Sequence, residues 1–173
     1  MSNVLIVAEQ FAGTLRKASL SAVAAGKQLA QRTGGKLTVA LLGKGIAAAA
    51  QELSSYGVTV LAADDAALEH PLAEAYAPVI ARLAKEQGAA YVGAAATALG
   101  KDLLPRVAAK LEAGMAGDVL ATGGDGAAVT FKRPMWAGNV LAEVELATAV
   151  KVFTVRPTEF AAAAKEGGGA VTA

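Results

Sequence analysis

The sequence predicts an α/β fold in which a doubly wound, mostly parallel sheet carries helices on both faces and continues into a β-meander. Three observations predict it. Short apolar runs alternate with longer segments of helical periodicity in the first part of the chain. Glycines close several of these helical segments. The later part instead contains short runs separated by turn residues, as expected for strands joined by tight turns.

Length and composition set the kind of core. A chain of 173 residues is long enough for one domain with a substantial core. Hydrophobic residues make up 54% of the chain but aromatic residues only 5%. The core is therefore predicted to consist mainly of Ala, Val and Leu in closely packed layers.

Charge and cysteine content exclude several classes of function. Sixteen basic and fifteen acidic residues give a net charge of +1, too little to drive nucleic-acid binding. The absence of cysteine excludes disulfides, thiolate catalysis and cysteine-ligated zinc. The apolar run at the start is short and is followed by Glu9, so we expect no signal peptide, no membrane insertion and a cytoplasmic location.

Four apolar runs predict the parallel strands. Each is short and continuous, which is typical of strands buried on both faces. They occupy residues 3–8, 36–42, 58–63 and 89–95.

Helices are predicted after each of these strands. Apolar side chains recur near helical spacing there, and Gly34, Gly57 and Gly88 provide stops. The predicted helical segments are 14–35, 46–57, 64–88 and 101–114.

Prolines refine two of the helical segments. Pro71 and Pro78 predict a boundary or a kink in the third segment. Pro105 is compatible with a first helical turn, so the fourth helix is expected to begin near Asp102, with Asp102 as its N-cap.

The later part of the chain predicts the meander and a tail. The motifs GGDG, WAGN and AT separate the predicted strands. The closing stretch has an alanine run, three glycines and no apolar pattern, so we expect a domain over residues 1–164 and a Gly-rich linker or flexible tail over 165–173. The four short strands are predicted at 118–123, 127–134, 140–146 and 149–155.

Two glycine-rich turns lack the residues of a nucleotide site. Gly100 and Lys101 follow a predicted strand, but Gly93 lies seven residues before Gly100 and Asp102 replaces the hydroxyl residue of a phosphate loop. The LLGKGI stretch at 41–46 lacks the third glycine and the downstream acid of a dinucleotide fingerprint, and is interpreted as a tight strand-to-helix turn.

Other candidate groups predict no catalytic or metal site. His70 is the only histidine, which excludes a histidine metal cluster, and it is interpreted as structural or solvated. Asp64 and Asp65 are interpreted as first-turn residues of a helix. The FKRPMWAGN hairpin at 131–139 contains two cations and the only tryptophan. These residues either anchor a protein interface, or the tryptophan covers the end of the sheet beside a solvated Lys-Arg pair.

Three ordered motifs then indicate a family. GKDLLPRVAAKLEAGMAGDV, KRPMWAGNVLAEVE and KVFTVRPTEF, with the opening VLIVAEQ, closely resemble the amino-terminal domain of the electron transfer flavoprotein α subunit. The resemblance extends from about Asn3 to Ala164. It implies an adenine nucleotide α-hydrolase-like fold and a heterodimer with one FAD. Such a heterodimer is an electron carrier, not an enzyme; it moves electrons from dehydrogenases, such as the acyl-CoA dehydrogenases of fatty acid β-oxidation, to a quinone oxidoreductase.

The resemblance also limits what this chain is expected to do. In that family the FAD contacts come overwhelmingly from a second, carboxyl-terminal domain of the α subunit, so no cofactor-binding residue is expected here. The implied partners are the β subunit and the FAD domain that is missing from this chain. The residues expected to contact a partner or that domain are Lys101, Arg106, Arg133, Trp136, Asn139 and Arg156.

An alternative from another functional class stays open. The chain would then be a standalone adenine-nucleotide-binding domain of the universal-stress type, using the strand-end crevice near Glu9, Gly43 and Gly100. The late glycine-rich loop of such proteins is not found in the sequence.

Overall fold

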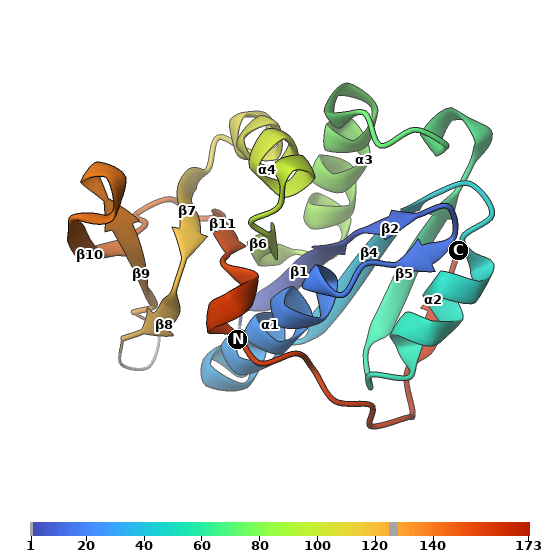
Figure 1. Cartoon of the computed structure of the whole chain (residues 1–173), viewed down its shortest axis with the longest axis horizontal. Helices are drawn as coiled ribbons and strands as arrows, with labels where there is room; N and C mark the ends of the chain where they lie inside the picture. The colour runs from blue at the N-terminus through green and yellow to red at the C-terminus, as the bar shows by residue number, and fades with distance from the viewer. Residues whose placement is uncertain (1, 125–127) are drawn as a thin grey trace.

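The central element is a parallel sheet of seven strands. The computed structural model describes residues 2–124 and 128–173, and within them the strand order is β12-β5-β4-β1-β6-β11-β7 (Figure 1). Every neighbouring pair in this sheet is parallel. The strands are β1 (Asn3–Ala8), β4 (Leu37–Gly43), β5 (Thr59–Asp64), β6 (Ala89–Ala95), β7 (Gly114–Val119), β11 (Lys151–Val155) and β12 (Ala170–Thr172).

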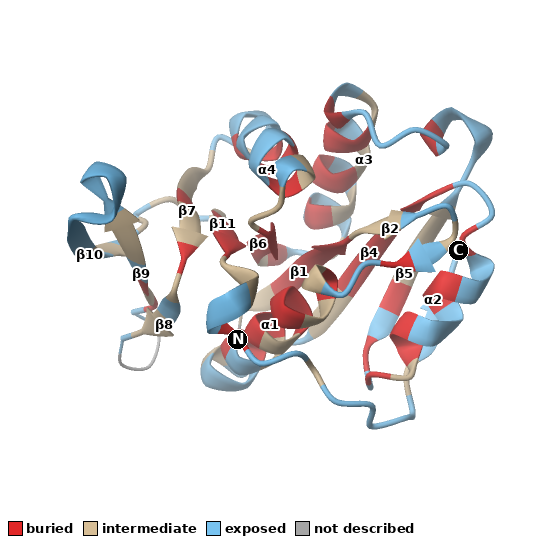
Figure 2. Cartoon of the chain, in the orientation of Figure 1, coloured by how far each residue is buried: buried red, intermediate tan, exposed pale blue. Residues whose placement is uncertain are grey.

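Helices cover both faces of this sheet, which confirms the predicted fold class. Helices α1 (Ala18–Thr33) and α2 (Ala47–Ser54) pack on one face, whereas α3 (Ala73–Glu86) and α4 (Ala98–Lys110) pack on the other. Their buried residues face the strands (Figure 2). In the described segments, no helix is both long and apolar enough to cross a membrane.

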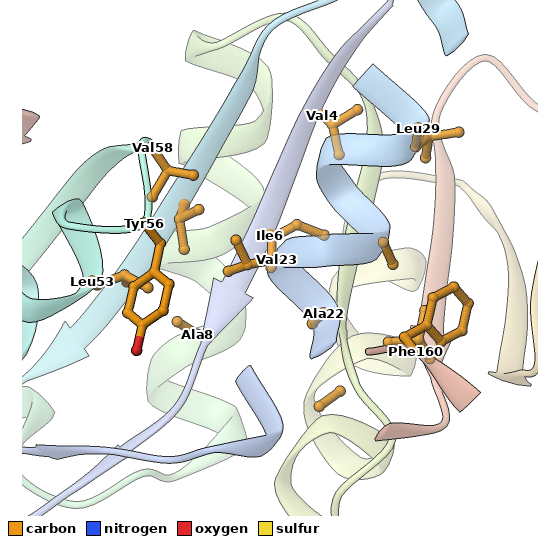
Figure 3. Packing of buried hydrophobic residues seen from close by; sticks show 14 of the residues in the cluster. Val4, Ile6, Ala8, Ala22, Val23, Leu29, Leu53, Tyr56, Val58 and Phe160 are labelled. Carbon is orange, nitrogen blue, oxygen red and sulfur yellow. The ribbon is translucent and has the colours of Figure 1, made fainter. Parts of the chain in front are cut away.

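Small side chains allow the layers to pack closely. Ala22 and Val23 of α1 lie against the apolar residues of β1, including Ile6 (Figure 3). Tyr56, which follows α2, closes the same cluster near Ala8. The Ala- and Val-rich composition is thus used where the helices approach the sheet.

Most predicted boundaries agree with the structure. β1 and β6 have the predicted bounds, and Gly34 ends α1 in the left-handed conformation at φ 65°. Pro71 does mark a boundary, because α3 begins at Ala73, but Pro78 lies inside that helix. A short antiparallel pair, β2 (Gln10–Phe11) and β3 (Thr14–Leu15), replaces the predicted start of the first helix.

The predicted start of the fourth helix is wrong. α4 begins at Ala98, and its N-cap is Thr97, whose hydroxyl oxygen accepts a hydrogen bond from the Gly100 N–H at 3.0 Å. A threonine cap satisfies a free backbone donor of the first turn, so the helix starts a turn earlier than Asp102. Pro105 therefore lies within the helix.

The predicted meander is smaller than expected. Only β8 (Ala121–Gly123), β9 (Thr130–Met135) and β10 (Val140–Glu145) form an antiparallel sheet, in the order β10-β9-β8. The run at 149–155 instead supplies β11, which is buried along most of its length and lies between β6 and β7. The predicted GGDG turn at 123–126 lies partly outside the described residues.

The last residues also differ from a free tail. β12 pairs in parallel with β5, so residues 170–172 extend the central sheet. The preceding segment is fixed by hydrogen bonds from the Glu166 and Gly167 N–H groups to the Ser55 carbonyl, at 3.0 and 2.9 Å. Lys27 adds an ion pair with Glu166 at 2.7 Å. The predicted domain boundary at residue 164 stays a prediction.

Two phenylalanines join the small sheet to the large one. Phe131 of β9 and Phe153 of β11 are fully buried, with ring centroids 5.5 Å apart and an interplanar angle of 29°. Gly93 of β6 leaves the space for the Phe153 ring, because a Cβ at Gly93 would lie 2.4 Å from the Phe153 Cζ. This contact sets where the antiparallel sheet leaves the domain.

We predict that Gly93→Ala destabilises the domain by about 1–3 kcal/mol, the usual cost of overpacking a core. The added methyl group would push the Phe153 ring from its position. Urea unfolding measures the change. The control is Gly117→Ala on β7, where the nearest atom to an added Cβ is 3.9 Å away. An equal, small effect of both substitutions would show that the ring does not depend on Gly93.

Candidate functional site

An ion pair lies where the main sheet meets the small sheet. Arg156, directly after β11, donates from Nε to Asp118 Oδ1 at 3.1 Å and from Nη2 to Asp118 Oδ2 at 2.5 Å. This two-point geometry is the strong form of an arginine–carboxylate contact. The hydrogen bond from Arg156 holds the pKa of Asp118 below its ordinary value.

Asp118 is held in an uncommon conformation. Its φ is 57°, in the left-handed region that few non-glycine residues adopt. The Asp118 N–H donates to Thr154 Oγ1 at 2.9 Å, and the Arg156 N–H donates to the Val119 carbonyl at 2.8 Å. These bonds fix both residues of the ion pair at the carboxyl ends of β7 and β11.

A hollow of about 490 Å³ opens beside this ion pair. The turn Trp136–Gly138, between β9 and β10, forms its outer wall. Asn139 fixes that turn, because both its side-chain amide and its backbone N–H donate to the Trp136 carbonyl, at 2.9 and 3.1 Å. The hollow is lined by Asp118, Arg133, Pro134, Met135, Trp136, Ala137, Gly138 and Arg156.

The same hairpin carries a group of exposed apolar side chains. We call Met135, Trp136, Val140 and Leu141 the apolar tip. Trp136 is 78% exposed and Leu141 is 55% exposed. The tip holds four of the seven large hydrophobic side chains that are exposed in the described part of the chain. Met135 and Val140 lie opposite each other on one face of the hairpin, and Leu141 lies on the other face. Exposed apolar side chains gathered on one hairpin suit a protein interaction site, whereas single exposed hydrophobic residues are ordinary.

The structure places five of the six residues predicted as contacts in or around this hollow. Arg133, Trp136 and Arg156 line the hollow. Asn139 holds the turn beside it, and the charge of Lys101 acts on Asp118 from α4. Asp118 is not among the predicted site residues, because nothing in the local pattern shows which residue the Arg156 guanidinium meets.

Arg106 lies apart from this hollow. Its side chain forms ion pairs with Asp102 at 3.2 Å on its own helix and with Glu74 of α3 at 3.1 Å. It therefore braces the two helices on one face of the sheet. Whether it also contacts a partner stays a prediction.

Two side chains of the protein are hydrogen-bonded across the crevice at the carboxyl ends of β1 and β6. The carboxylate of Glu9, after β1, accepts a hydrogen bond from the hydroxyl of Thr97, after β6. Burial raises the pKa of Glu9. An adjacent hollow of about 600 Å³ is lined by residues that include Phe11, Arg16 and Lys17.

Another carboxylate occupies the LLGKGI turn. The N–H groups of Gly45 and Ile46 donate to Asp64 at 2.7 and 3.0 Å. Asp64 thus lies where a helix N-terminus would otherwise receive a phosphate. The predicted strand-to-helix turn is confirmed. The first-turn assignment of the two acids is wrong, because Asp64 ends β5 and Asp65 is the N-cap of the 3-10 turn Ala66–Leu68, accepting from the Ala67 N–H at 2.8 Å.

Possible metal ligands do not gather in the described ranges. No group of three or more His, Asp or Glu side chains within residues 2–124 and 128–173 is placed to hold a metal ion.

Comparison with known proteins identifies the family. The family model described as "Electron transfer flavoprotein domain" matches residues 4–173. The chain belongs to this family. It is 43% identical over 169 residues to the electron transfer flavoprotein subunit alpha of Pseudomonas aeruginosa, with 96% of this chain and 52% of that protein covered.

Further relatives agree with this family. The electron transfer flavoprotein subunit alpha of Paracoccus denitrificans is 41% identical over 172 residues, with 98% of this chain and 53% of that protein covered. A probable mitochondrial electron transfer flavoprotein subunit alpha of Cryptococcus neoformans is 36% identical over 173 residues, with 98% and 49% covered. The chain spans about half the length of the curated relatives it matches, consistent with the amino-terminal domain of an α subunit.

We predict an acid-sensitive contribution of the Asp118–Arg156 pair to the stability of this electron transfer flavoprotein domain. Because the pKa of Asp118 is lower in the folded than in the unfolded chain, the pair stabilises the fold above about pH 4. This contribution is lost as the pH falls through the folded-state pKa. Asp118→Asn is therefore expected to flatten the acid side of the stability profile, measured by urea unfolding from pH 7 to pH 3.

Asp102→Asn is the control for this prediction, since Asp102 makes an exposed pair with Arg106 along one helix. An unchanged acid profile in Asp118→Asn would contradict the assignment. The Asn substitution is chosen because asparagine tolerates the left-handed backbone.

Proposed function

We propose that this chain is the first domain of an electron transfer flavoprotein α subunit and that its apolar tip docks the β subunit. The observation that carries the proposal is the tip itself. Trp136 and its neighbours are exposed to solvent on a hairpin that the buried pair Phe131 and Phe153 holds in place. Tryptophan at the centre of an exposed apolar group is a frequent anchor of protein interfaces. The relatives' name, electron transfer flavoprotein subunit alpha, supports a role within a larger assembly.

The intact heterodimer would carry FAD, but the described residues do not fit the flavin. A dinucleotide needs free N–H groups for its phosphates at the carboxyl ends of the strands. Asp64 occupies these groups at the start of α2, and Thr97 occupies one at the start of α4. We therefore assign FAD to the remainder of the α subunit and to the β subunit, and derive no chemical step from this chain.

In this proposal the heterodimer is an electron carrier. In the cytoplasm it accepts electrons from dehydrogenases, such as acyl-CoA dehydrogenases, and it delivers them to a membrane quinone oxidoreductase. The domain in hand contributes a rigid platform and a docking surface.

We predict that Trp136→Ala weakens binding to the β subunit of the same organism at least about tenfold, as expected for an interface anchor. Titration calorimetry of the purified chain with that subunit measures the dissociation constant. Phe11→Ala is the control, because Phe11 is also an exposed aromatic residue, 68% exposed, but lies on β2. Failure of the unsubstituted chain to bind the β subunit would refute the docking proposal.

A second candidate is the standalone adenine-nucleotide binder. The hollow beside Thr97, with Arg16 and Lys17 in its lining, is the observation that favours it. Against it, a phosphate at either helix start would have to displace Asp64 or approach the buried carboxylate of Glu9.

We predict no saturable binding of AMP, ATP or FAD to the purified chain in titration calorimetry. The reason is that the chain's own oxygen atoms already occupy the N–H donors that would hold the phosphates. Micromolar binding of AMP or ATP would favour the nucleotide binder instead. Tight binding of FAD alone would contradict the assignment of the flavin to the rest of the heterodimer.

A further inference from the structure

We propose that the hollow beneath the apolar tip is a receptor for a single carboxylate, an Asp or Glu side chain of the docked partner, and that Arg133 binds it. This inference rests on the proposed docking function and names the polar contact at its centre. The occupant is a protein side chain because the hollow and the apolar tip share Met135 and Trp136. A partner that covers Met135 and Trp136 would therefore also lie over the hollow.

Arg133 has hydrogen-bonding capacity that the described residues leave unused. Its Nε is buried and has no hydrogen-bond partner, and no ion pair of Arg133 occurs among residues 2–124 and 128–173. A buried donor without a partner costs free energy, whereas a charged hydrogen bond recovers it. The fork of an arginine guanidinium matches the two oxygens of a carboxylate.

The nearest carboxylate is already engaged. Both oxygens of Asp118 accept hydrogen bonds from Arg156. The charges of Lys101, Arg133 and Arg156 all lower the pKa of Asp118, so three cations surround this one carboxylate. Glu159, which acts on Arg156, is the other acidic group in the neighbourhood. The hollow therefore keeps an excess of positive charge and attracts a second anion.

The walls of the hollow favour a side-chain carboxylate over a phosphate. Pro134, Met135 and Trp136 line the hollow together with the guanidinium groups of Arg133 and Arg156. A partner that covers these apolar residues would remove water from the guanidinium groups and strengthen a single charge-assisted bond. A phosphate carries a charge of about −2, which it would place close to the negative charge of Asp118. A carboxylate brings one, and its aliphatic stem suits the apolar walls.

The test compares two neighbouring cations of β9. Arg133→Met removes the guanidinium and keeps an unbranched side chain. Lys132→Met removes an exposed charge on the opposite face of the strand, where the residue across from it on β10 is Glu143. Arg133→Met is expected to weaken binding to the β subunit by about 30-fold or more, as for loss of one partner of a buried charge pair. Lys132→Met is expected to change it by less than about threefold.

Arg133→Lys and a charge reversal provide independent readings. Arg133→Lys keeps the charge but loses the fork, so we expect an intermediate loss. Arg133→Glu should abolish binding, and one Asp→Lys or Glu→Lys substitution in the β subunit should restore it. Thermal unfolding checks each variant; if Arg133→Met does not fold, Arg133→Lys and the rescue decide.

The outcomes separate the two proposals. If the unsubstituted chain binds the β subunit and Trp136→Ala weakens it, but Arg133→Met binds like Lys132→Met, the carboxylate receptor is wrong and the docking surface stands. If the unsubstituted chain does not bind the β subunit, both proposals fail. If one acid-to-lysine substitution in the β subunit restores its binding to the Arg133→Glu variant, that position identifies the bound side chain.

Discussion

The contact on which the candidate site depends is the packing of Phe153 over Gly93, with Phe131 stacked against Phe153. β11 enters the central sheet between β6 and β7 because a buried strand there satisfies the backbone groups of both neighbours. Its phenylalanine then needs the space that Gly93 leaves open. Phe131 completes the contact from β9, so the hairpin leaves the domain at a fixed place. The tip can stand exposed because its base is part of the core.

A second theme is that the chain's own oxygen atoms occupy the anion-binding positions of its fold. Doubly wound sheets bind phosphates where helix N-termini meet the ends of parallel strands. Here Asp64 holds the start of α2 and Thr97 holds the start of α4. Gly100 serves packing instead of phosphate binding, because a Cβ there would lie 2.0 Å from the Ala95 carbonyl oxygen. The architecture is that of a nucleotide-binding fold, but the N–H groups that would bind a phosphate form hydrogen bonds within the chain.

Local pattern was sufficient to predict four of the seven central strands, namely β1, β4, β5 and β6, and the approximate ends of the helices that follow them. β1 and β6 are continuous apolar runs, and such runs have few alternatives to a buried strand. α4 was misplaced because two residue types competed: Pro105 favoured a late start, but the Thr97 cap stabilises an early one. The place of β11 was not predictable from its sequence, since a buried run does not reveal which strands it will join.

The candidate site was predictable only in part, for a similar reason. The crowding of Arg133 and Trp136 in one hairpin is visible in the sequence, and the structure does place both at one hollow. Asp118 was missed because its importance comes from a distant residue, Arg156, and from a backbone angle that no motif announces.

β12 has a consequence of a different kind: by pairing with β5 it satisfies the backbone donors and acceptors along one edge of the sheet. A chain cut before Ala170 would leave the six-residue β5 as the edge strand in place of the three-residue β12, and longer unpaired edges favour pairing between molecules.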